Sequence, residues 1–431
     1  MASGNVWEGV IPDMFGYTRG VHLPQKKEPA VTLPIADLPE VQRVLLPIAL
    51  AGEAFAVPSR QRGEAVRRGE IAAQPIDKPH CPVFSPIDGI VAGHTTFEHP
   101  VYGEMTCLVV EGTEAGEPLP PVHQDASVLS QKELRELARL AGIVDELDGV
   151  PLHRKLRDWS ELNVSCLVVD AVEGEPYGAA ALGVLEVQAR QVMEGLRLAQ
   201  RACGAQEVRL SVRTSPLRMT ALRRQVGARA VYAVHDATYP YEQIAPRRFR
   251  TVCRVGAQAC LALFRAAGYT EPQTTMVVTV AGDAVARPQN VRVPIGTPAE
   301  AVLELCGLQC EPQAVVFGDA LTGVAGNPMM PLLHGTTCLL ALKAPAQAQE
   351  RPCITCGRCA HACHKGLLPY EIDRLCRTMQ YELLGPMHPE DCDACGACSY
   401  VCPARRDVMA HVFEATFDTG AVIREGDDRD E

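Results

Sequence analysis

The sequence predicts a multidomain α/β protein, and three observations support this prediction. The chain has 431 residues, which is too long for a single hydrophobic core. Short β segments punctuated by glycine fill its N-terminal part, and helices alternate with strands in its middle. Near the C-terminus, cysteines recur in two regular runs. We therefore expect several domains joined by linkers.

The overall composition excludes several classes of protein. Hydrophobic residues make up 47% of the chain and charged residues 22%, an ordinary globular balance. The formal net charge of −11 argues against non-specific nucleic-acid binding. The N-terminus lacks the basic and apolar regions of a signal peptide, and no apolar run is long enough to span a bilayer. We expect a cytoplasmic protein without direct membrane insertion, which would reach a membrane only peripherally, through a partner.

The N-terminal part is expected to comprise an irregular segment at 1–30 and a β domain at 31–112. The glycine-punctuated strands and turns of the β domain follow the rhythm of a biotinyl/lipoyl-type barrel sandwich. Carrier domains of that type display a modified lysine on a hairpin, and Lys78 lies near the corresponding place. Because Pro79 stiffens this loop, we favour a purely structural barrel.

An α/β domain is expected at 127–270. Ser130 as N-cap, with Glu133 three residues later, makes a capping box before an apolar helical stripe. Strands are expected at 163–170 and 207–212, and helices at 182–203 and 219–227. Alternation of this kind predicts a parallel sheet.

A further β unit is expected at 271–345, before a linker rich in proline and alanine. Its first part, 275–307, has the pattern of a β-hairpin followed by a helix. Pro298 falls near the start of that helix, where its missing N–H costs little. A cysteine-rich domain at 351–414 and an acidic, disordered tail at 415–431 complete the chain.

The two cysteine runs share the spacing C-x-x-C-x-x-C-x-x-x-C, which is typical of [4Fe–4S] clusters. The runs are Cys353, Cys356, Cys359, Cys363 and Cys392, Cys395, Cys398, Cys402. Three closely spaced cysteines direct their thiolates at one cluster, and the longer gap turns the fourth away. In two-cluster ferredoxins the fourth cysteine binds the other cluster. We therefore expect Cys402 to complete the first set and Cys363 to complete the second, in a ferredoxin-like helical domain.

Zinc and disulfides explain these cysteines less well. A structural zinc site takes four ligands, usually as two C-x-x-C pairs, and the two three-plus-one runs exceed that number. Disulfides are rare in the reducing compartment that the missing signal peptide implies. Outside the runs, the histidines and carboxylates are scattered and offer no convincing nucleophile or acid–base pair. The sequence therefore favours electron transfer over bond-making chemistry, although it leaves open whether the chain is an enzyme.

The segment between the two cysteine runs is expected to form a helix at 369–384. Its apolar face would contain Ile372, Leu375, Cys376, Met379 and Leu383. This pattern interprets Cys376 as a packing residue rather than a ligand. His361 and His364, beside the first run, are expected to face solvent rather than to bind metal.

In the order of these parts, the chain resembles the RnfC subunit of Rnf electron-transport complexes, and especially the soluble relatives associated with proline reductase. The resemblance covers nearly the whole length, from Gly-Val-His-Leu-Pro at 20–24 to the cysteine runs. It implies a flavin-domain-like α/β layer at 127–270, like the flavin subunit of complex I, and an SLBB domain at 271–345. It also implies FMN, two [4Fe–4S] clusters, and electron transfer between NAD(H) and a redox partner, either other Rnf-type subunits or a reductase such as proline reductase.

The chain departs from this family in the glycine-rich loop, G-x-G-G-A-G-F-P-T-x-x-K. Between 142 and 155, the residues that agree are Gly142, Gly149, Pro151 and Lys155. Glycines let backbone N–H groups approach a phosphate, whereas Asp145, Glu146 and Asp148 place carboxylates there. At roughly 5 Å, each carboxylate would oppose a phosphate by about 2–3 kcal/mol. The loop therefore argues against bound FMN and for a scaffold that has lost nucleotide binding.

Two further stretches echo the family. Glu173 and Glu175 belong to E-G-E-P-Y, which matches the family's E-C-E-P-Y except for the cysteine, and Tyr239 lies in an imperfect match to T-K-Y-P-Q-G. With Lys155, the two glutamates are the candidate residues of a remnant flavin or nucleotide site. The alternative interpretation of the glutamates is a retained surface turn.

Three hypotheses of function follow. The leading one is an iron–sulfur protein that relays electrons between redox partners through two [4Fe–4S] clusters, with a degenerate flavin site. The alternative is an FMN-dependent NADH:acceptor oxidoreductase subunit of RnfC type. The third is an assembly subunit whose domains dock other proteins and whose clusters are only structural. The sequence names neither the electron donor nor the acceptor.

Overall fold

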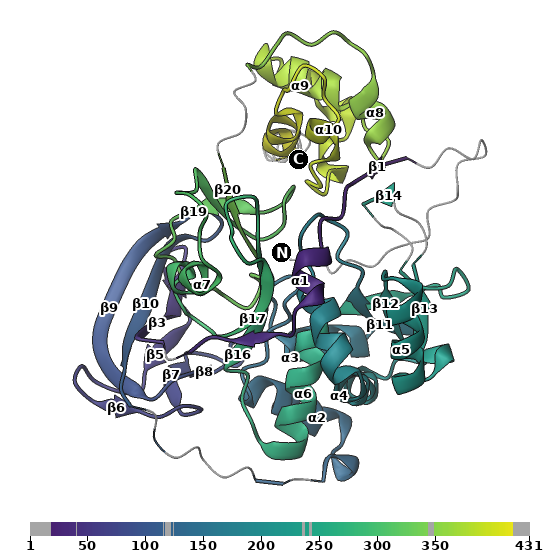
Figure 1. Cartoon of the computed structure of the whole chain (residues 1–431). Coiled ribbons are helices and arrows are strands. Elements are labelled where there is room, and N and C mark those ends of the chain that lie inside the picture. Colours follow the sequence, from purple (N-terminus) through teal and green to yellow (C-terminus); the bar gives the residue numbers. More distant parts are fainter. Residues whose placement is uncertain are drawn as a thin grey trace, which may run out of the picture.

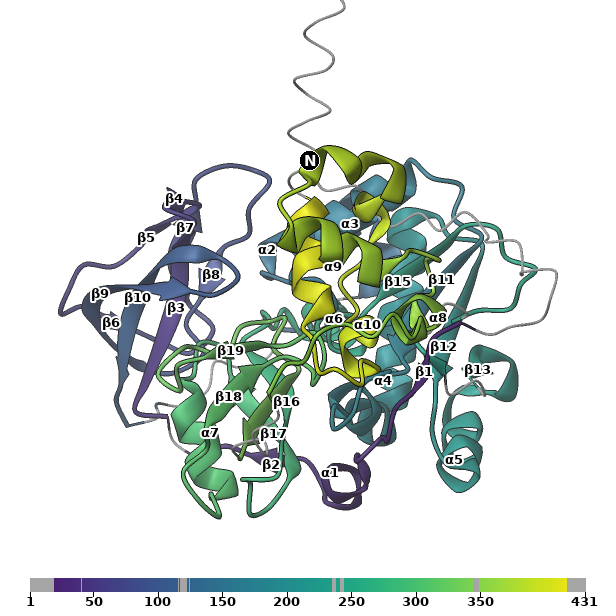
Figure 2. The same cartoon turned by 90° about the horizontal axis from the view of Figure 1, so that it is seen from above.

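The structure is a computed structural model that describes residues 19–39, 41–114, 116, 122–123, 125–234, 238–240, 244–343 and 349–416. These residues form a barrel sandwich, an α/β domain, a mixed β unit and a cysteine-rich helical domain (Figure 1). Seen from above, the barrel and the α/β domain lie on opposite sides, and the cysteine-rich domain lies over the middle (Figure 2). The predicted multidomain α/β fold class is thus confirmed. Among the helices described, none combines the length and hydropathy of a membrane span.

The barrel sandwich consists of two antiparallel sheets, with strand orders β4-β3-β10-β9-β6 and β5-β7-β8. Its strands are β3 (Arg43–Leu50), β4 (Glu53–Ala54), β5 (Ala56–Pro58), β6 (Ala65–Val66), β7 (Ile71–Pro75), β8 (Val83–Phe84), β9 (Gly89–His99) and β10 (Gly103–Gly112). Alternating residues such as Val44, Leu46 and Leu108 fill the core between the sheets. Strands β9 and β10 are longer than the short segments we predicted. Lys78 is exposed in the loop between β7 and β8.

The N-terminal segment, expected to be irregular, contains regular structure in its described part. Strand β1 (Val21–His22) pairs with β14 (Thr238–Tyr239), and helix α1 (Glu28–Thr32) follows. Strand β2 (Ala36–Asp37) then joins the edge of the mixed sheet beside β17. Residues 21–27 therefore form a strap, which crosses from the cysteine-rich domain to the α/β domain (Figure 1).

The α/β domain is built on a four-stranded parallel sheet with the order β13-β12-β11-β15, as predicted. Its elements are α2 (Gln131–Leu140), α3 (Leu152–Ser160), β11 (Cys166–Ala171), α4 (Ala180–Cys203), β12 (Glu207–Val212), α5 (Pro216–Val226), β13 (Val231–Ala233), β15 (Val252–Val255) and α6 (Ala257–Tyr269). The capping box of Ser130 and Glu133 starts α2 as expected. Helices α4 and α6 are in close contact, because a Cβ on Gly195 would lie 1.8 Å from the carbonyl oxygen of Cys260.

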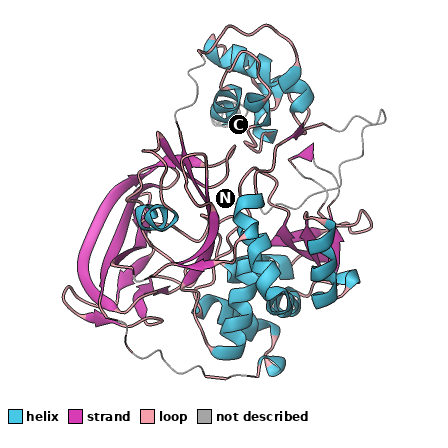
Figure 3. Cartoon of the chain, viewed as in Figure 1, coloured by secondary structure: helices cyan, strands magenta, loops and turns pink. Residues whose placement is uncertain are grey.

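The mixed β unit has the strand order β19-β18-β20-β16-β17-β2. Its elements are β16 (Thr275–Ala281), β17 (Gln289–Pro294), α7 (Ala299–Cys306), β18 (Ala314–Phe317), β19 (Val324–Gly326) and β20 (Cys338–Leu342). Strands β16 and β17 form the predicted hairpin, and Pro298 is the N-cap of α7. Strand-rich and helix-rich parts of the molecule are separated in Figure 3.

The cysteine-rich domain contains α8 (Arg358–Ala362), α9 (Pro369–Arg377), α10 (Ala397–Tyr400) and a helical segment at 408–416. The helix expected at 369–384 ends at Arg377, because Met379 adopts a left-handed conformation, with a φ of 55°, that cannot continue a right-handed helix. Met379 and Leu383 are consequently 75% and 49% exposed rather than buried. Leu384 packs in the core instead. Residues 417–431 of the acidic tail lie outside the described residues.

Candidate functional site

The eight cysteines of the two runs line two separate hollows. The first set consists of Cys353, Cys356, Cys359 and Cys402, around about 360 Å³ of space that is partly open to solvent. The second set consists of Cys363, Cys392, Cys395 and Cys398, around about 340 Å³. The structure therefore exchanges the fourth cysteine of each run, in the grouping that the spacing predicts. Four thiols around one hollow suit a [4Fe–4S] cluster.

Left-handed residues shape both cysteine loops. Thr355 and Ala394 have φ of 51° and 54°, and Gly357 and Gly396 have φ of 71° and 74°. These turns aim backbone N–H groups at sulfur, so that Thr355 donates to Sγ of Cys353 and Ala394 to Sγ of Cys392, both at 3.4 Å. Hydrogen bonds to the sulfurs help to set the potential of a bound cluster. The donor set of each hollow therefore fits the cluster that the sequence predicts.

The protonation of the free thiols differs from that of bound ones. Burial raises the pKa of Cys395 and of Cys398 to about 12. At neutral pH these side chains are therefore protonated until iron binds, because metals bind the thiolate and release the proton. Loading of the second set is expected to release protons to solvent.

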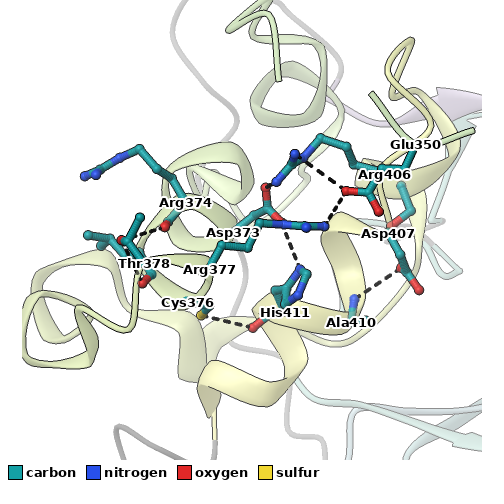
Figure 4. A network of polar contacts seen from close by, with 12 residues as sticks. Glu350, Asp373, Arg374, Cys376, Arg377, Thr378, Arg406, Asp407, Ala410 and His411 are labelled. Carbon is teal, nitrogen blue, oxygen red and sulfur yellow. Dashed lines mark hydrogen bonds and ion pairs between the residues drawn. The ribbon is translucent and has the colours of Figure 1, made fainter. Parts of the chain in front are cut away.

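A buried polar network lies beside the first set (Figure 4). Asp373 on α9 is 1% exposed, and its carboxylate accepts hydrogen bonds from Arg406 at 2.6 Å and Arg377 at 3.0 Å. Nδ1 of His411 lies 2.8 Å from the same carboxylate. Both Asp373 and Arg406 line the first hollow. The network therefore joins α9 to the chain that carries Cys402.

The two histidines beside the first run have different environments. His361 is exposed as expected, but the side chain of His364 is only 4% exposed, so that expectation was wrong for His364. Its Nε2 lies 2.8 Å from a carboxylate oxygen of Asp393. The ligand atoms of His364, Asp393 and Cys395 lie within 4.8 Å of one another. All three residues line the second hollow and therefore belong to its wall.

Lys155 does not face an open nucleotide site. Its Nζ donates to Asp145 at 2.6 Å and to Asp148 at 2.7 Å, and the Lys155 and Asp145 side chains are buried. Burial alone would lower the pKa of Lys155, but the two carboxylates outweigh it and raise that pKa. The lysine that matches the family motif is thus neutralised within its own loop.

The same loop covers the N-terminus of α6. Asp145 accepts a hydrogen bond from the backbone N–H of Gly256 at 3.0 Å. Glu146 accepts from Gln258 at 2.6 Å and from Ala259 at 2.9 Å. Burial, and secondarily the charge of Asp145, raises the pKa of Glu146 to about 8. Two carboxylates therefore occupy the helix end where an anion would bind.

The two candidate glutamates also bind parts of the chain. Glu173 accepts hydrogen bonds from Ala181 at 2.9 Å and Leu182 at 3.2 Å, at the start of α4. Glu175 accepts from the backbone of Leu321 at 2.5 Å and from Oγ1 of Thr322 at 2.6 Å. The glutamates therefore fix the helix and the neighbouring mixed unit, rather than projecting from a surface turn.

Tyr239 connects this edge of the α/β domain to the second set. Its hydroxyl lies 3.0 Å from Glu175 and donates to the carbonyl oxygen of Cys395 at 2.7 Å. Its ring packs with Val21, Leu23 and Ala397. The sequence indicated Tyr239 only as a family echo, because its contact with Cys395 spans 156 residues.

These contacts test whether a flavin phosphate fits the α/β domain. The strand order reverses between β11 and β15, which is where open α/β sheets bind ligands, and α4 and α6 start there. The N–H groups of both helix ends already donate to Glu173, Asp145 and Glu146. A Cβ on Gly256 would lie 2.0 Å from the carboxyl carbon of Glu146. The residues present do not fit a phosphate group at either helix end.

Three regions of the chain match known domain families. Residues 15–115 match the RnfC barrel sandwich hybrid domain, 138–243 the Nuo51 FMN-binding domain, and 277–331 the SLBB domain. These matches agree with the order of domains that the resemblance implied.

Curated relatives match over most of the chain. One subunit of the ion-translocating oxidoreductase complex of Rhodobacter capsulatus is 27% identical over 389 residues, which are 83% of this chain and 74% of that protein. One subunit of the Na(+)-translocating ferredoxin:NAD(+) oxidoreductase complex of Acetobacterium woodii is 26% identical over 381 residues, 82% of this chain and 85% of that protein.

Among solved structures, a chain of the NAD+-reducing [NiFe]-hydrogenase in its H2-reduced state matches with a TM-score of 0.46 and 16% identity. The match covers 68% of this chain and 63% of the hydrogenase chain. The family rests instead on the three domain matches in order, on the relatives that span most of the chain, and on the cysteine-rich C-terminal domain. The chain therefore belongs to the RnfC family of electron-transferring oxidoreductase subunits.

Proposed function

We propose that this chain relays electrons between redox partners through two [4Fe–4S] clusters, as a subunit of an RnfC-type oxidoreductase complex. The observation that supports this most directly is the convergence of two sets of four cysteines on two hollows. When bound, the clusters supply one-electron transfer. The chain holds them and shields the second set. Its partners would be other Rnf-type subunits or a reductase such as proline reductase, on the cytoplasmic side of the membrane.

The surroundings of the two sets suggest a direction for the relay. The second set packs against the α/β domain, where Tyr239 bonds to Cys395 and Leu321 lies against Gly396. Cys353 and Cys356 of the first set are exposed. We propose that electrons enter or leave the domain at the first set and reach the interior at the second.

The cluster assignment makes a stoichiometric prediction. Protein reconstituted without oxygen should contain about eight iron and eight acid-labile sulfide per chain, because each set completes a four-iron cluster. Colorimetric iron and sulfide analysis measures both values. Cys310→Ser, at an exposed cysteine outside the two sets, is the control and should leave the values unchanged. Saturation near four iron, or retention of zinc instead, would contradict the two-cluster proposal.

A second candidate function is an FMN-dependent NADH:acceptor oxidoreductase subunit. The match of residues 138–243 to the Nuo51 FMN-binding domain favours this alternative directly. The relay proposal, by contrast, depends on the carboxylates at the start of α6, which favour a degenerate site. Flavin binding therefore decides between the two.

We expect the full chain not to bind FMN stoichiometrically. A carboxylate that opposes the phosphate by about 2–3 kcal/mol weakens binding by roughly 30- to 150-fold. The measurement is quenching of FMN fluorescence on titration, together with NADH oxidation by the protein alone, which should be negligible. Tight one-to-one binding, with flavin absorbance near roughly 370 and 450 nm, would establish the alternative.

A further inference from the structure

The two cysteine sets differ in the surface that surrounds them. The second set is covered by the strap and by Tyr239, whose apolar cluster includes Val21 and Leu23. The first set is open: Cys353 and Cys356 are exposed, and Ile354 between them is 66% exposed. A large protein partner can therefore approach the first set without moving other parts of the chain.

Arginines lie at the surface around the exposed first set. Arg351, Arg358 and Arg405 are exposed, and none of their guanidinium groups has an ion pair among the described residues. Arg358 lines the first hollow, and the backbone N–H of Arg351 donates at 2.9 Å to the carbonyl of Ala404, which also lines it.

Nearby carboxylates do not neutralise these arginines. Glu350 pairs with Arg377 at 2.6 Å and lies 3.6 Å from Arg406. Asp407 accepts hydrogen bonds from Ser399 at 3.2 Å and from the backbone of Ala410 at 3.3 Å. The cationic character of this face contrasts with the net charge of −11 of the whole chain.

We infer that the face formed by Arg351, Ile354, Arg358 and Arg405 docks an acidic one-electron carrier protein. This inference rests on the proposed function. Guanidinium groups pair with carboxylates bidentately, and a charged rim accelerates and orients the encounter. Exposed Ile354 supplies an apolar centre beside the cysteines. One electron moves between the carrier and the first set, so that one is oxidised and the other reduced, with no bond or proton transferred.

A different role would be to balance the negative charge of a bound cluster. Arg406 already has the position for that role, because its side chain is buried, lines the first hollow and pairs with Asp373. Arg351, Arg358 and Arg405 are instead exposed to solvent. Their placement therefore favours contact with a partner over contact with the cluster.

The test compares two triple variants of the iron-loaded full chain. The first is Arg351→Glu with Arg358→Glu and Arg405→Glu, and a glutamine version of it guards against misfolding. The control is Arg62→Glu with Arg67→Glu and Arg68→Glu. These exposed arginines flank β6 in the barrel, far from the cysteine-rich domain, and the control makes the same change in net charge (Figure 1). Iron content checks that each variant retains its clusters.

The probe is an acidic plant-type [2Fe–2S] ferredoxin, with cytochrome c as a basic counterpart. Calorimetry gives ferredoxin affinity, and stopped-flow absorbance gives the electron-transfer rate, between about 0.02 M and 0.5 M salt. We expect the first triple variant to weaken ferredoxin binding at low salt by about tenfold or more, and the control to change it by less than about twofold. High salt should remove the difference, and the first variant should react faster with cytochrome c.

Three results would overturn the inference. Equal ferredoxin affinity in both triple variants would do so. A shifted reduction potential of the first cluster with unchanged ferredoxin affinity would assign the arginines to charge balance. Binding of anionic lipid vesicles in place of ferredoxin would assign the face to a membrane surface. A wild-type protein without iron at the first set is distinguishable from all three, because it would overturn the proposed function and this inference with it.

Discussion

Cys363→Ser is expected to remove the cluster of the second set and to spare that of the first, although Cys363 lies in the first run. The reason is that Cys363 lines the hollow of Cys392, Cys395 and Cys398. Iron should fall from about eight to about four per chain, with loss of one EPR signal from the dithionite-reduced protein. Cys402→Ser should give the mirror result and remove the cluster of the first set.

The matched comparison for this prediction is Cys353→Ser. Cys353 belongs to the first run and to the first hollow, so its loss should remove a different EPR signal from that of Cys363→Ser. If both variants lose the same signal, each run binds its own cluster and the crossed arrangement is wrong.

Asp373→Asn is expected to lower the free energy of unfolding of the cysteine-rich domain by about 3–5 kcal/mol. Asp373 is buried and bonds to Arg406 and Arg377, with His411 beside it. A neutral amide leaves the buried guanidinium of Arg406 without its counter-charge, and an uncompensated buried charge is costly. The measurement is urea unfolding of the iron-loaded protein, followed by loss of cluster absorbance.

Glu371→Gln on the same helix is the control for Asp373→Asn. Glu371 pairs with Arg374 at the surface of α9, at 2.6 Å, and such pairs contribute about 0–1 kcal/mol. We therefore expect Glu371→Gln to leave the unfolding midpoint nearly unchanged. A similar loss in both variants would mean that the buried network of Figure 4 does not hold the first set in place.

The local pattern of the sequence predicted much of the fold. Strand β12 runs from Glu207 to Val212 as expected, and Ser130 starts α2. These predictions depend on neighbouring residues, because capping and strand alternation act over a few positions. The end of α9 was predicted too far along the chain, because the apolar pattern continues past Met379 while its left-handed backbone stops the helix.

The sequence by itself determined the order of the domains, the two cysteine sets and the loss of the glycine-rich loop. Regular spacing directs side chains through local backbone geometry, and the structure groups the cysteines accordingly. Cluster binding by these groups stays a prediction. The carboxylates of Asp145 and Glu146 were also visible as departures from the family motif.

Only the tertiary structure decided what those carboxylates and their neighbours contact. Glu146 reaches the start of α6 across 112 residues, and Glu175 reaches Thr322 across 147. His364 is buried because the chain around Asp393 folds over it. Such contacts depend on how distant segments pack, and no local pattern specifies which N–H group a buried carboxylate will satisfy. The same packing leaves the first set exposed and covers the second.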